Sequence, residues 1–166
     1  MKLDRVIAVR TTKTIYRDGD RCIKVFNPPY SKAAIFNEAS NHARIEETGL
    51  KIPKVLEVTM IDGKWAIVSE YIKGKTMEQL IAEHPENTID YYRTLADLQN
   101  SIHKKECPYL YRLKDELNNK ISVSELDATT RFDLHDRLER IAKGNSICHG
   151  DFCPSNIILS EDGIYY

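Results

Sequence analysis

The chain has 166 residues and a mass of 19.1 kDa, and 42% of its residues are hydrophobic and 30% are charged. This balance is typical of a globular protein with one domain or two small lobes, and it excludes disordered, collagen-like and membrane-bundle classes. The 24 basic and 25 acidic residues nearly cancel, so no overall field attracts nucleic acid or an anionic membrane. Because no signal-like N-terminus or long apolar run is present, we expect a cytoplasmic protein whose four cysteines are free thiols.

The first half of the chain is predicted to form strands. Two hairpins are expected because Asp18-Gly19-Asp20 and Asp62-Gly63 are turn sequences that supply residues with positive φ. The arms of the hairpins span 14–17 and 21–26, and 54–60 and 64–71. Along the second arm, alternation places Lys24 on the opposite face from Ile23 and Val25.

Between the two hairpins the sequence predicts one helix. Ser31 is a suitable N-cap and Gly49 a suitable C-terminal stop. Ile35, Ala39 and Ala43 recur every four residues, so we expect them to share one buried face.

The second half is mainly helical. Thr76 and Thr88 are expected to cap the first two helices, and two more helices follow. The apolar stripes of the last three helices are Tyr91, Leu95, Leu98 and Ile102; Leu113, Leu117 and Ile121; and Leu134, Leu138 and Ile141. Short strands are expected at 147–148, 157–159 and 164–166.

This order of elements predicts an α+β fold with two unlike parts. The sheet-rich part covers 1–72 and the helix-rich part covers 73–166. The two parts join near Lys73-Gly74-Lys75, where a cleft between them would be a natural ligand site.

The densest group of reactive side chains lies between Cys148 and Asn156, after one apolar segment and before another. A rigid loop there can present the Asp151 carboxylate and the Asn156 amide oxygen toward one point. The carboxylate can accept a hydroxyl proton, and the amide oxygen suits a hard cation such as Mg²⁺. The residues alone leave open a polar turn in which Asp151 only caps backbone amides.

In this loop His149-Gly150-Asp151, four residues and then Asn156 resemble the motif of the aminoglycoside phosphotransferase and choline kinase-like family. Residues 14–26 resemble the opening hairpin of that family, and residues 67–74 resemble its hinge. The three motifs occur in the family's order, each on the element predicted for it. The resemblance implies a protein-kinase-like fold, with a sheet-rich N-lobe that has one main helix and with an incomplete helical C-lobe.

The resemblance also implies an ATP-dependent kinase that phosphorylates a hydroxyl group of a small molecule. Asp151 would orient and deprotonate the acceptor hydroxyl, and Asn156 would hold a magnesium ion that bridges the nucleotide phosphates. Lys24 would bind the phosphates, and Glu38 would hold the Lys24 ammonium in an ion pair.

Some of these roles have rivals. Glu46 and Glu47 could replace Glu38, although negative charge is unfavourable near a helix C-terminus. The adenine base would be bound by the hinge backbone, through the Ser69 carbonyl and the amides near Tyr71. The alternative for the hinge is an ordinary strand end that binds no adenine. The alternative for Lys24 is an edge-strand lysine that simply reaches solvent.

The chain departs from the pattern of its relatives in three places. Residues 8–14 contain no glycine where protein kinases carry a phosphate loop, although Lys13 and the two threonines before it could still contact phosphate. Gly150 replaces the arginine of protein kinases, which favours kinases of small molecules. A further metal-binding aspartate has no counterpart up to Tyr166, so we expect a truncated, catalytically inactive chain that self-associates through exposed surface.

Two other classes of function are open. Cys148, His149 and Cys153 could bind a metal or form a thiol dyad, but no second Cys/His pair completes a zinc site. A non-catalytic nucleotide-binding or scaffold protein of the kinase fold is the other alternative. For a catalytic protein, the seven acidic and seven basic residues of 109–143 form no acidic wall for a polycationic antibiotic, so we expect a metabolite or other small hydroxyl compound.

Overall fold

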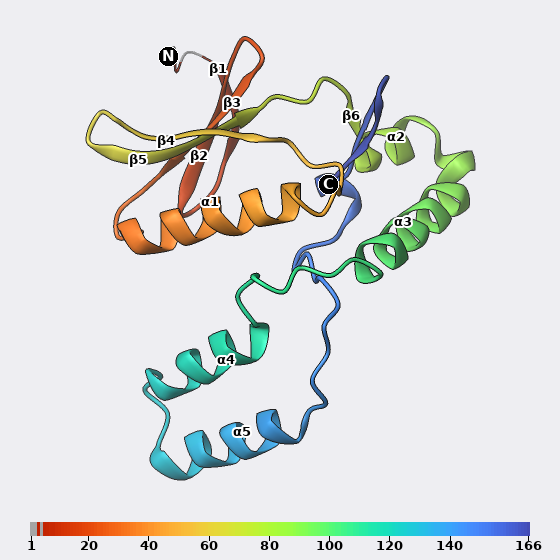
Figure 1. Ribbon diagram of the computed structural model, residues 1–166. Coiled ribbons are helices and arrows are strands. Elements are labelled where there is room, and N and C mark those ends of the chain that lie inside the picture. The colour runs from red at the N-terminus through yellow and green to blue at the C-terminus, as the bar shows by residue number, and fades with distance from the viewer. Residues whose placement is uncertain (1–2, 4) are drawn as a thin grey trace.

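The computed structural model describes residues 3 and 5–166. A part that is mainly sheet lies beside a part that is mainly helix (Figure 1). Residues 1, 2 and 4, at the start of the predicted N-lobe, lie outside the described residues.

A five-stranded antiparallel sheet forms the core of the first part. Its strands are β1 (Arg5–Val9), β2 (Lys13–Asp18), β3 (Arg21–Phe26), β4 (Val55–Ile61) and β5 (Lys64–Glu70), in the spatial order β1-β2-β3-β5-β4. The two predicted hairpins are confirmed as β2–β3 and β4–β5. The sequence analysis assigned no element to β1, an edge strand whose apolar side chains Val6 and Val9 are exposed.

The two faces of β3 pack against different partners, as the alternation predicted. Ile23 and Val25 pack against β5 on one face. Phe26 packs on the other face, where Ile35 and Ala39 of α1 (Lys32–Glu46) cover the sheet. The helix therefore lies on the face of the sheet that carries Lys24 (Figure 1).

The predicted start of α1 is confirmed, because the Ser31 hydroxyl accepts a hydrogen bond from the Ala34 amide at 3.1 Å. Ile35 and Ala39 are buried, but Ala43 is exposed, so the predicted stripe is wrong at its last member. Eight residues of α-helix turn about 80° past two full rotations, which carries Ala43 away from the face of Ile35.

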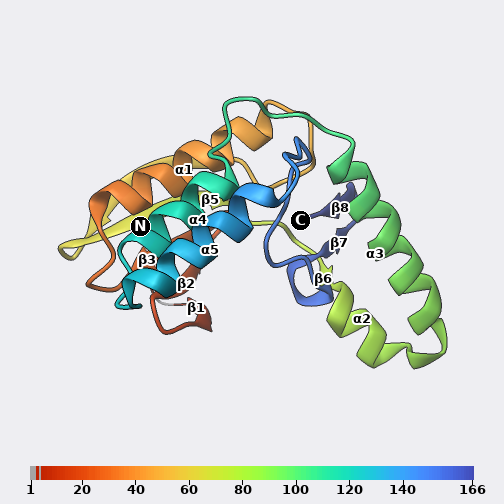
Figure 2. The ribbon, with the colours of Figure 1, turned by 90° about the horizontal axis from the view of Figure 1, so that it is seen from below.

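The second part contains a small sheet and four α-helices. Its elements are β6 (Lys75–Thr76), α2 (Met77–Glu83), α3 (Thr88–His103), α4 (Leu113–Ser122), α5 (Ala128–Arg140), β7 (Ile158–Ser160) and β8 (Gly163–Tyr165), with short 3₁₀ turns at Pro85–Asn87 and Pro154–Asn156. The three strands pair in the order β6-β7-β8. Viewed from below, α3 and the α4–α5 pair lie on opposite sides of the C-terminus (Figure 2).

Several predictions for the second part are confirmed and others are wrong. Thr76 caps α2 in a reciprocal capping box with Gln79. Thr88 does not cap α3, because the preceding 3₁₀ turn runs directly into the helix and the Thr88 hydroxyl donates to the Pro85 carbonyl at 2.7 Å. Ile141 lies beyond the end of α5 and is exposed.

The remaining differences concern pairing and burial. Along the predicted α3 stripe only Ile102 is fully buried, and its other members are half-buried. The predicted strand at Ile147 and Cys148 is wrong, since this segment has no regular structure. Ile147 is nevertheless buried, because it packs into a hydrophobic cluster rather than a sheet. The strand β6, which pairs with β7, was not predicted.

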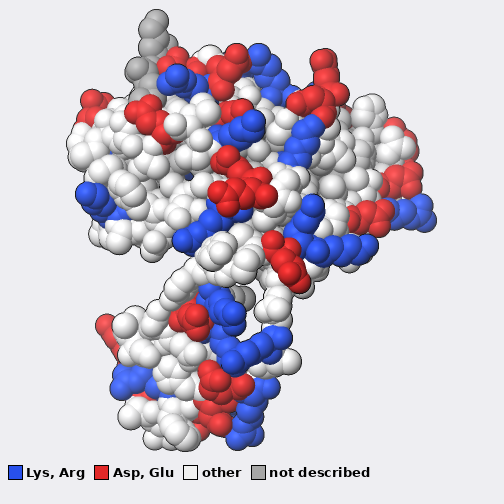
Figure 3. Space-filling view, viewed as in Figure 1, with Lys and Arg blue, Asp and Glu red and all other residues white. Residues whose placement is uncertain are grey.

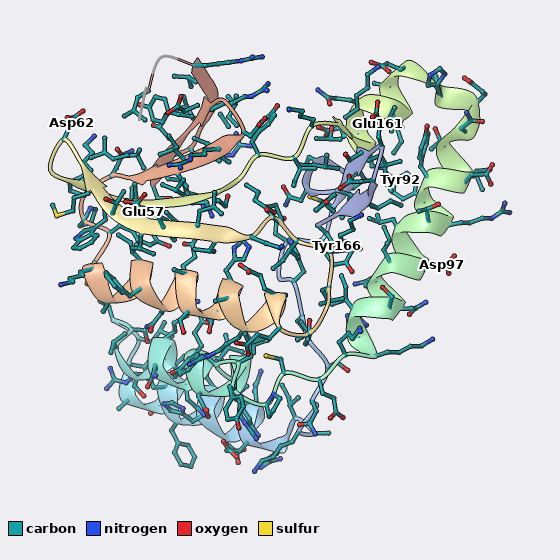
Figure 4. The ribbon with its side chains drawn as sticks, turned by 45° about the horizontal axis from the view of Figure 1, so that its top comes forward. Glu57, Asp62, Tyr92, Asp97, Glu161 and Tyr166 are labelled. Carbon is teal, nitrogen blue, oxygen red and sulfur yellow. The ribbon has the colours of Figure 1, made fainter. Side chains whose placement is uncertain are left out.

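One hydrophobic cluster joins the two parts. Leu50, which follows α1, packs with Ile102 of α3 and with Ile147, and Phe152 and Tyr166 pack around them. Figure 4 shows Tyr166 in the space between α1 and α3. This cluster fixes the loop after Ile147 relative to the sheet.

None of the helices among the described residues is long and apolar enough to cross a membrane.

Candidate active site

Lys24 and Glu38 form an ion pair between the sheet and α1. The Lys24 Nζ lies 2.6 Å from the Glu38 Oε1, and the two side chains are 28% and 29% exposed. Lys24 stands in the middle of β3, between β2 and β5, and Glu38 stands one turn after Ile35 in α1. The pair is therefore shielded on one side by the core and open on the other, which suits a cation that binds an anionic ligand.

The observed partner of Lys24 is Glu38, and the two rival glutamates have other positions. The Glu46 Oε1 accepts a hydrogen bond from the Val55 amide at 2.7 Å, which ties the end of α1 to β4. Glu47 is the exposed C-cap residue of α1.

Lys13 is a second cation close to the ion pair. Burial lowers the pKa of Lys13, and the Lys24 ammonium lowers it further. This lysine sits at the start of β2, directly after the glycine-free turn between β1 and β2. An anion that binds beside these two ammonium groups would offset the repulsion that Lys13 feels from Lys24.

Asp151 and Asn156 meet in the loop before β7. The Asn156 Nδ2 donates to the Asp151 Oδ2 at 2.9 Å and to the Asp151 main-chain oxygen at 2.8 Å. Both residues are exposed. Because the amide nitrogen points to Asp151, the Asn156 oxygen points away from that carboxylate.

The conformation of this loop depends on local contacts. Gly150 has φ +85°, which is unfavourable for any residue with a side chain. The Asp151 amide then donates to the His149 Nδ1 at 3.2 Å, and the His149 ring contacts the edge of Phe152. Phe152 packs into the cluster that joins the two parts of the molecule, so the loop is anchored on one side of Asp151.

The thiol of Cys153 also contacts the Asp151 carboxylate. The Cys153 Sγ lies 3.8 Å from the Asp151 Oδ1 and 3.2 Å from the Ser155 Oγ. The hydrogen bonds to the Asp151 carboxylate thus come from the side chains of Cys153 and Asn156, and not from backbone amides as in a simple capped turn. The sequence analysis considered Cys153 as a metal ligand or as part of a thiol dyad and missed this contact.

The predicted hinge begins at the end of β5, which contains Ser69, and continues to Tyr71 just after the strand. The Tyr71 amide donates to the Asp20 carbonyl at 2.9 Å, so in this structure it is engaged by the β2–β3 turn. Ser69 lies opposite Cys22 in the sheet, on the face that carries Lys24. Burial raises the pKa of the Cys22 thiol. Cys22 was not singled out from the sequence, although the alternation along 21–26 already places it beside Lys24.

A cavity of about 810 Å³ lies at the junction of the two parts, where the sequence predicted a cleft. Its lining includes Tyr71, Lys73, Leu159 and Glu161, and Figure 4 shows Glu161 at the tip of the β7–β8 hairpin. Lys24, Glu38, Asp151 and Asn156 are not among the residues that line this cavity, which lies beside the hinge.

The donors present are suited to a magnesium ion that arrives with a nucleotide. Asn156 offers an amide oxygen, which is a hard ligand that can join the phosphate oxygens around Mg²⁺, whereas the Asp151 carboxylate is left to act on the acceptor. Within the described residues, no three His, Cys, Asp or Glu side chains form a group that could hold a metal by themselves. Asp162 lies in the β7–β8 turn as predicted, and the Tyr165 hydroxyl, which donates to it at 2.6 Å, lowers the pKa of its carboxyl.

Comparison with known families gives one match along nearly the whole chain. The model of the APH phosphotransferase enzyme family matches residues 4–165. No curated protein sequence matches the chain at a significant level.

Solved structures share the fold. An aminoglycoside-3'-phosphotransferase of type VIII is 22% identical, with a TM-score of 0.59 over 94% of this chain and 66% of that protein. APH(3'')-Id from Streptomyces rimosus ATCC10970 is 19% identical, with a TM-score of 0.64 over 96% of this chain and 68% of that protein. That second protein has also been solved in complex with ADP and streptomycin. The chain spans about two thirds of the length of these proteins, and the predicted protein-kinase-like α+β fold is confirmed.

Proposed function

Because the chain belongs to the phosphotransferase enzyme family, we propose that it transfers the γ-phosphoryl group of ATP to a hydroxyl group of a small molecule. The observation that carries the proposal is the exposed Asp151 carboxylate, held by Asn156 at 2.9 Å in a loop that is anchored to the core through Phe152. An acceptor hydroxyl needs an accessible base in a fixed orientation, and this arrangement supports both requirements.

In the proposed reaction Asp151 acts on the acceptor. Its carboxylate orients the hydroxyl and takes the proton as the hydroxyl oxygen attacks the γ-phosphorus and ADP departs. Asn156 holds Asp151 through its amide nitrogen and offers its oxygen to magnesium. Magnesium, when bound with ATP, neutralises charge on the phosphate oxygens.

Lys24 and Glu38 form the nucleotide half of the proposed site. The Lys24 ammonium binds the phosphates, and Glu38 orients that ammonium from α1. Lys13 adds a second positive charge next to it. At the hinge we assign adenine binding to the backbone around Ser69 and Tyr71, with the Ser69 carbonyl as acceptor, because the Tyr71 amide already donates to Asp20.

The acceptor that we propose is a small metabolite with a free hydroxyl. The helical segment 109–143 contains equal numbers of acidic and basic residues, so it offers no strongly negative surface to a polycation. APH(3'')-Id, which has been solved with streptomycin, supports a small-molecule acceptor in general.

The test is an assay of ATP-dependent phosphorylation with magnesium, over a panel of aminoglycosides and uncharged hydroxyl compounds. Where a further metal-binding aspartate completes the site, we expect transfer to a hydroxyl compound, and we expect Asp151→Asn to lower kcat by about 10²- to 10⁴-fold while nucleotide affinity is kept. Asp97→Asn, which changes an exposed aspartate on α3 (Figure 4), is the matched control and should leave kcat unchanged. Near-full kcat in Asp151→Asn would remove Asp151 from the role of base.

A second candidate is a nucleotide-binding protein of the same fold without catalytic activity. One observation favours it: among the described residues no three His, Cys, Asp or Glu side chains form a group that could hold a metal, at Asp151 or elsewhere. Mg²⁺ releases its waters reluctantly, so a site with few protein ligands should bind the metal weakly and transfer the phosphoryl group slowly. Binding of Mg-ATP by the 166-residue chain without transfer to any acceptor would establish this second function.

A further inference from the structure

Lys13 is a half-buried lysine on the face of the sheet that carries Lys24. In the β2–β3 pair Lys13 lies opposite Phe26, and Lys24 lies two residues before Phe26 in β3. Residues opposite each other, and residues two apart in a strand, share a face, so the two lysines lie on the same face. The Lys13 Nζ lies 5.9 Å from the centre of the Phe26 ring, which packs against α1. Lys13 is therefore held over the sheet beside the Lys24–Glu38 pair.

Positive charge is in excess around Lys13. Among the described residues no carboxylate forms an ion pair with its ammonium, and Glu38, whose charge raises the Lys13 pKa, is already paired with Lys24 at 2.6 Å. Arg10 acts in the opposite direction, since its charge lowers the Lys13 pKa. Among these four side chains three cations face one carboxylate, so an anionic ligand would balance the charge.

This excess is local. On the face of the molecule seen in Figure 3, acidic and basic side chains alternate and no wide patch of one sign forms. The whole chain carries a formal net charge of -1. A general attraction for polyanions is therefore not expected, and an anion bound at Lys13 must be small and held by the site itself.

The turn before Lys13 leaves phosphate binding to side chains. Glycine-rich loops bind phosphate through free backbone amides. Here the Arg10 amide donates to the Lys13 carbonyl at 2.8 Å, and the Lys13 amide donates to the Arg10 carbonyl at 3.4 Å. The Thr12 carbonyl accepts from the Asn27 amide at 2.8 Å, which ties the turn to the end of β3. The two amides at the ends of the turn are thus engaged, whereas the Lys13 ammonium is not.

The register of the sheet places Lys13 at the far end of the site from the hinge. Ser69 lies opposite Cys22, and Lys24 follows two residues further along β3. Lys13 lies opposite Phe26, which is four residues along from Cys22. At about 3.3 Å per residue, Lys24 is about 7 Å and Lys13 about 13 Å from the level of the hinge. A nucleotide whose base lies at the hinge would run past Lys24, and its last phosphate would come nearest to Lys13.

We propose that Lys13 binds the terminal phosphate of the nucleotide and makes the site select a nucleoside triphosphate over a diphosphate. This role rests on the proposed function, which places the base at the hinge and the phosphates at Lys24. The ammonium donates a charge-assisted hydrogen bond to the third phosphate, and a diphosphate, which ends near Lys24, does not gain that contact. Such a preference suits a transferase, because ADP then gives up the site to a new triphosphate.

The first test is a calorimetric titration of the 166-residue chain with Mg-ADP and with the magnesium complex of the non-hydrolysable β,γ-imido analogue of ATP. We expect the wild type to bind the triphosphate about tenfold more tightly than ADP. Lys13→Met keeps the length of the side chain without its charge. It should bind the triphosphate about tenfold more weakly and keep its affinity for ADP. Lys24→Ala should weaken both complexes, and Lys64→Met, at an exposed position of β5, should weaken neither.

The outcomes separate this role from the proposed function. A wild type that binds neither nucleotide would overturn the proposed nucleotide site and the role of Lys13 with it. A wild type that binds both without preference would overturn the role of Lys13 alone. The same holds for a Lys13→Met variant that keeps the preference or that loses both nucleotides equally.

The second test uses only the wild-type chain, so it does not depend on how the variant folds. Burial and the Lys24 charge lower the pKa of Lys13, so its amine can be acetylated at neutral pH and followed by mass spectrometry. The triphosphate analogue should suppress acetylation of Lys13, Mg-ADP should not, and Lys64 should react equally in all samples. Protection of Lys13 by both nucleotides, or by neither, would overturn its role in selecting the triphosphate.

Discussion

The two halves of the candidate site are positioned in different ways. Lys24 and Glu38 are 14 residues apart and come from a strand and a helix, so their contact depends on how α1 packs on the sheet. Asp151 and Asn156 are five residues apart in one loop, and hydrogen bonds within the loop bring them together. The first pair is the product of the fold, whereas the second is the product of local sequence.

This difference indicates where each half is vulnerable. A change in the core under α1 should disturb the sheet half and the stability of the whole molecule together. A change in the loop should alter the chemistry of the site and leave stability nearly unchanged. The following variants test that separation.

The largest effect is expected from Ile35→Ala. Ile35 is 1% exposed and packs between α1 and the sheet one turn before Glu38, so its truncation should lower the free energy of unfolding by about 3 kcal/mol. Denaturant unfolding measures this value. Ile89→Ala removes the same atoms from an exposed site and should change it by less than about 0.5 kcal/mol. Equal effects of the two substitutions would contradict the packing of α1 described above.

Gly74→Ala should destabilise the junction between the two parts. A Cβ at Gly74 would lie 2.3 Å from the Leu159 carbonyl oxygen and 2.8 Å from the Ile158 Cγ2, so either β6 or β7 must move. We expect a loss of about 2 kcal/mol in the free energy of unfolding. At Gly144 nothing lies within 4 Å of the added atom, so Gly144→Ala is the control that should show no loss. A Gly74→Ala protein as stable as the control would show that β6 does not approach β7 this closely.

Asn156→Ala tests the loop half. The side chain is exposed, and its removal deletes the two hydrogen bonds to Asp151, so the free energy of unfolding should fall by less than about 1 kcal/mol. The response of phosphoryl transfer to magnesium should nevertheless be lost. Unfolding and magnesium titrations on the same protein separate the two effects. A loss of stability as large as that of Ile35→Ala would mean that the loop is part of the folding core.

The smallest effect concerns the pH dependence of Cys22 reactivity. Burial raises the pKa of this thiol above its ordinary value of 9.0, so the reactive thiolate fraction stays small until the pH exceeds that value. The folded state therefore keeps the proton to higher pH than the unfolded state does. Below pH 9.0 the contribution of Cys22 to the free energy of unfolding is fully present. It falls as the pH rises from 9.0 through the raised pKa of the folded thiol.

Alkylation followed by mass spectrometry measures this directly. The rate at Cys22 should still be rising above pH 9.0, and exposed Cys148 should be labelled faster at neutral pH. A Cys22 rate that levels off below pH 9.0 would contradict the burial of the sheet face that carries Lys24.

The elements of the sheet half could be predicted from the sequence because local patterns determine them. Turn glycines, the Ser31 cap and the alternation along β3 predict the strand of Lys24 and the helix of Glu38, whereas the pairing of the two side chains was inferred from the family resemblance. The predictions failed where a distant segment decides the outcome. The predicted strand at Ile147 and Cys148 did not form, and β6, which was not predicted, forms because β7 pairs with it.

The loop half was predicted in its residues but not in its contacts. The motif from His149 to Asn156 identified the two side chains, and the structure adds that Asn156 donates to Asp151 and that Cys153 lies against the same carboxylate. These contacts depend on the left-handed backbone at Gly150 and on the packing of Phe152, neither of which follows from residue spacing.

The most direct test of the proposed site is a calorimetric titration of the 166-residue chain with Mg-ADP. The wild type should bind, Lys24→Ala should weaken binding by about tenfold or more, equivalent to about 1.4 kcal/mol, and Asp151→Asn should leave affinity nearly unchanged. Lys64→Ala, which removes an exposed lysine from β5 of the same sheet, should bind like the wild type. A wild type that does not bind, or a Lys24→Ala protein that binds as tightly as Lys64→Ala, would contradict a nucleotide site at the Lys24–Glu38 pair.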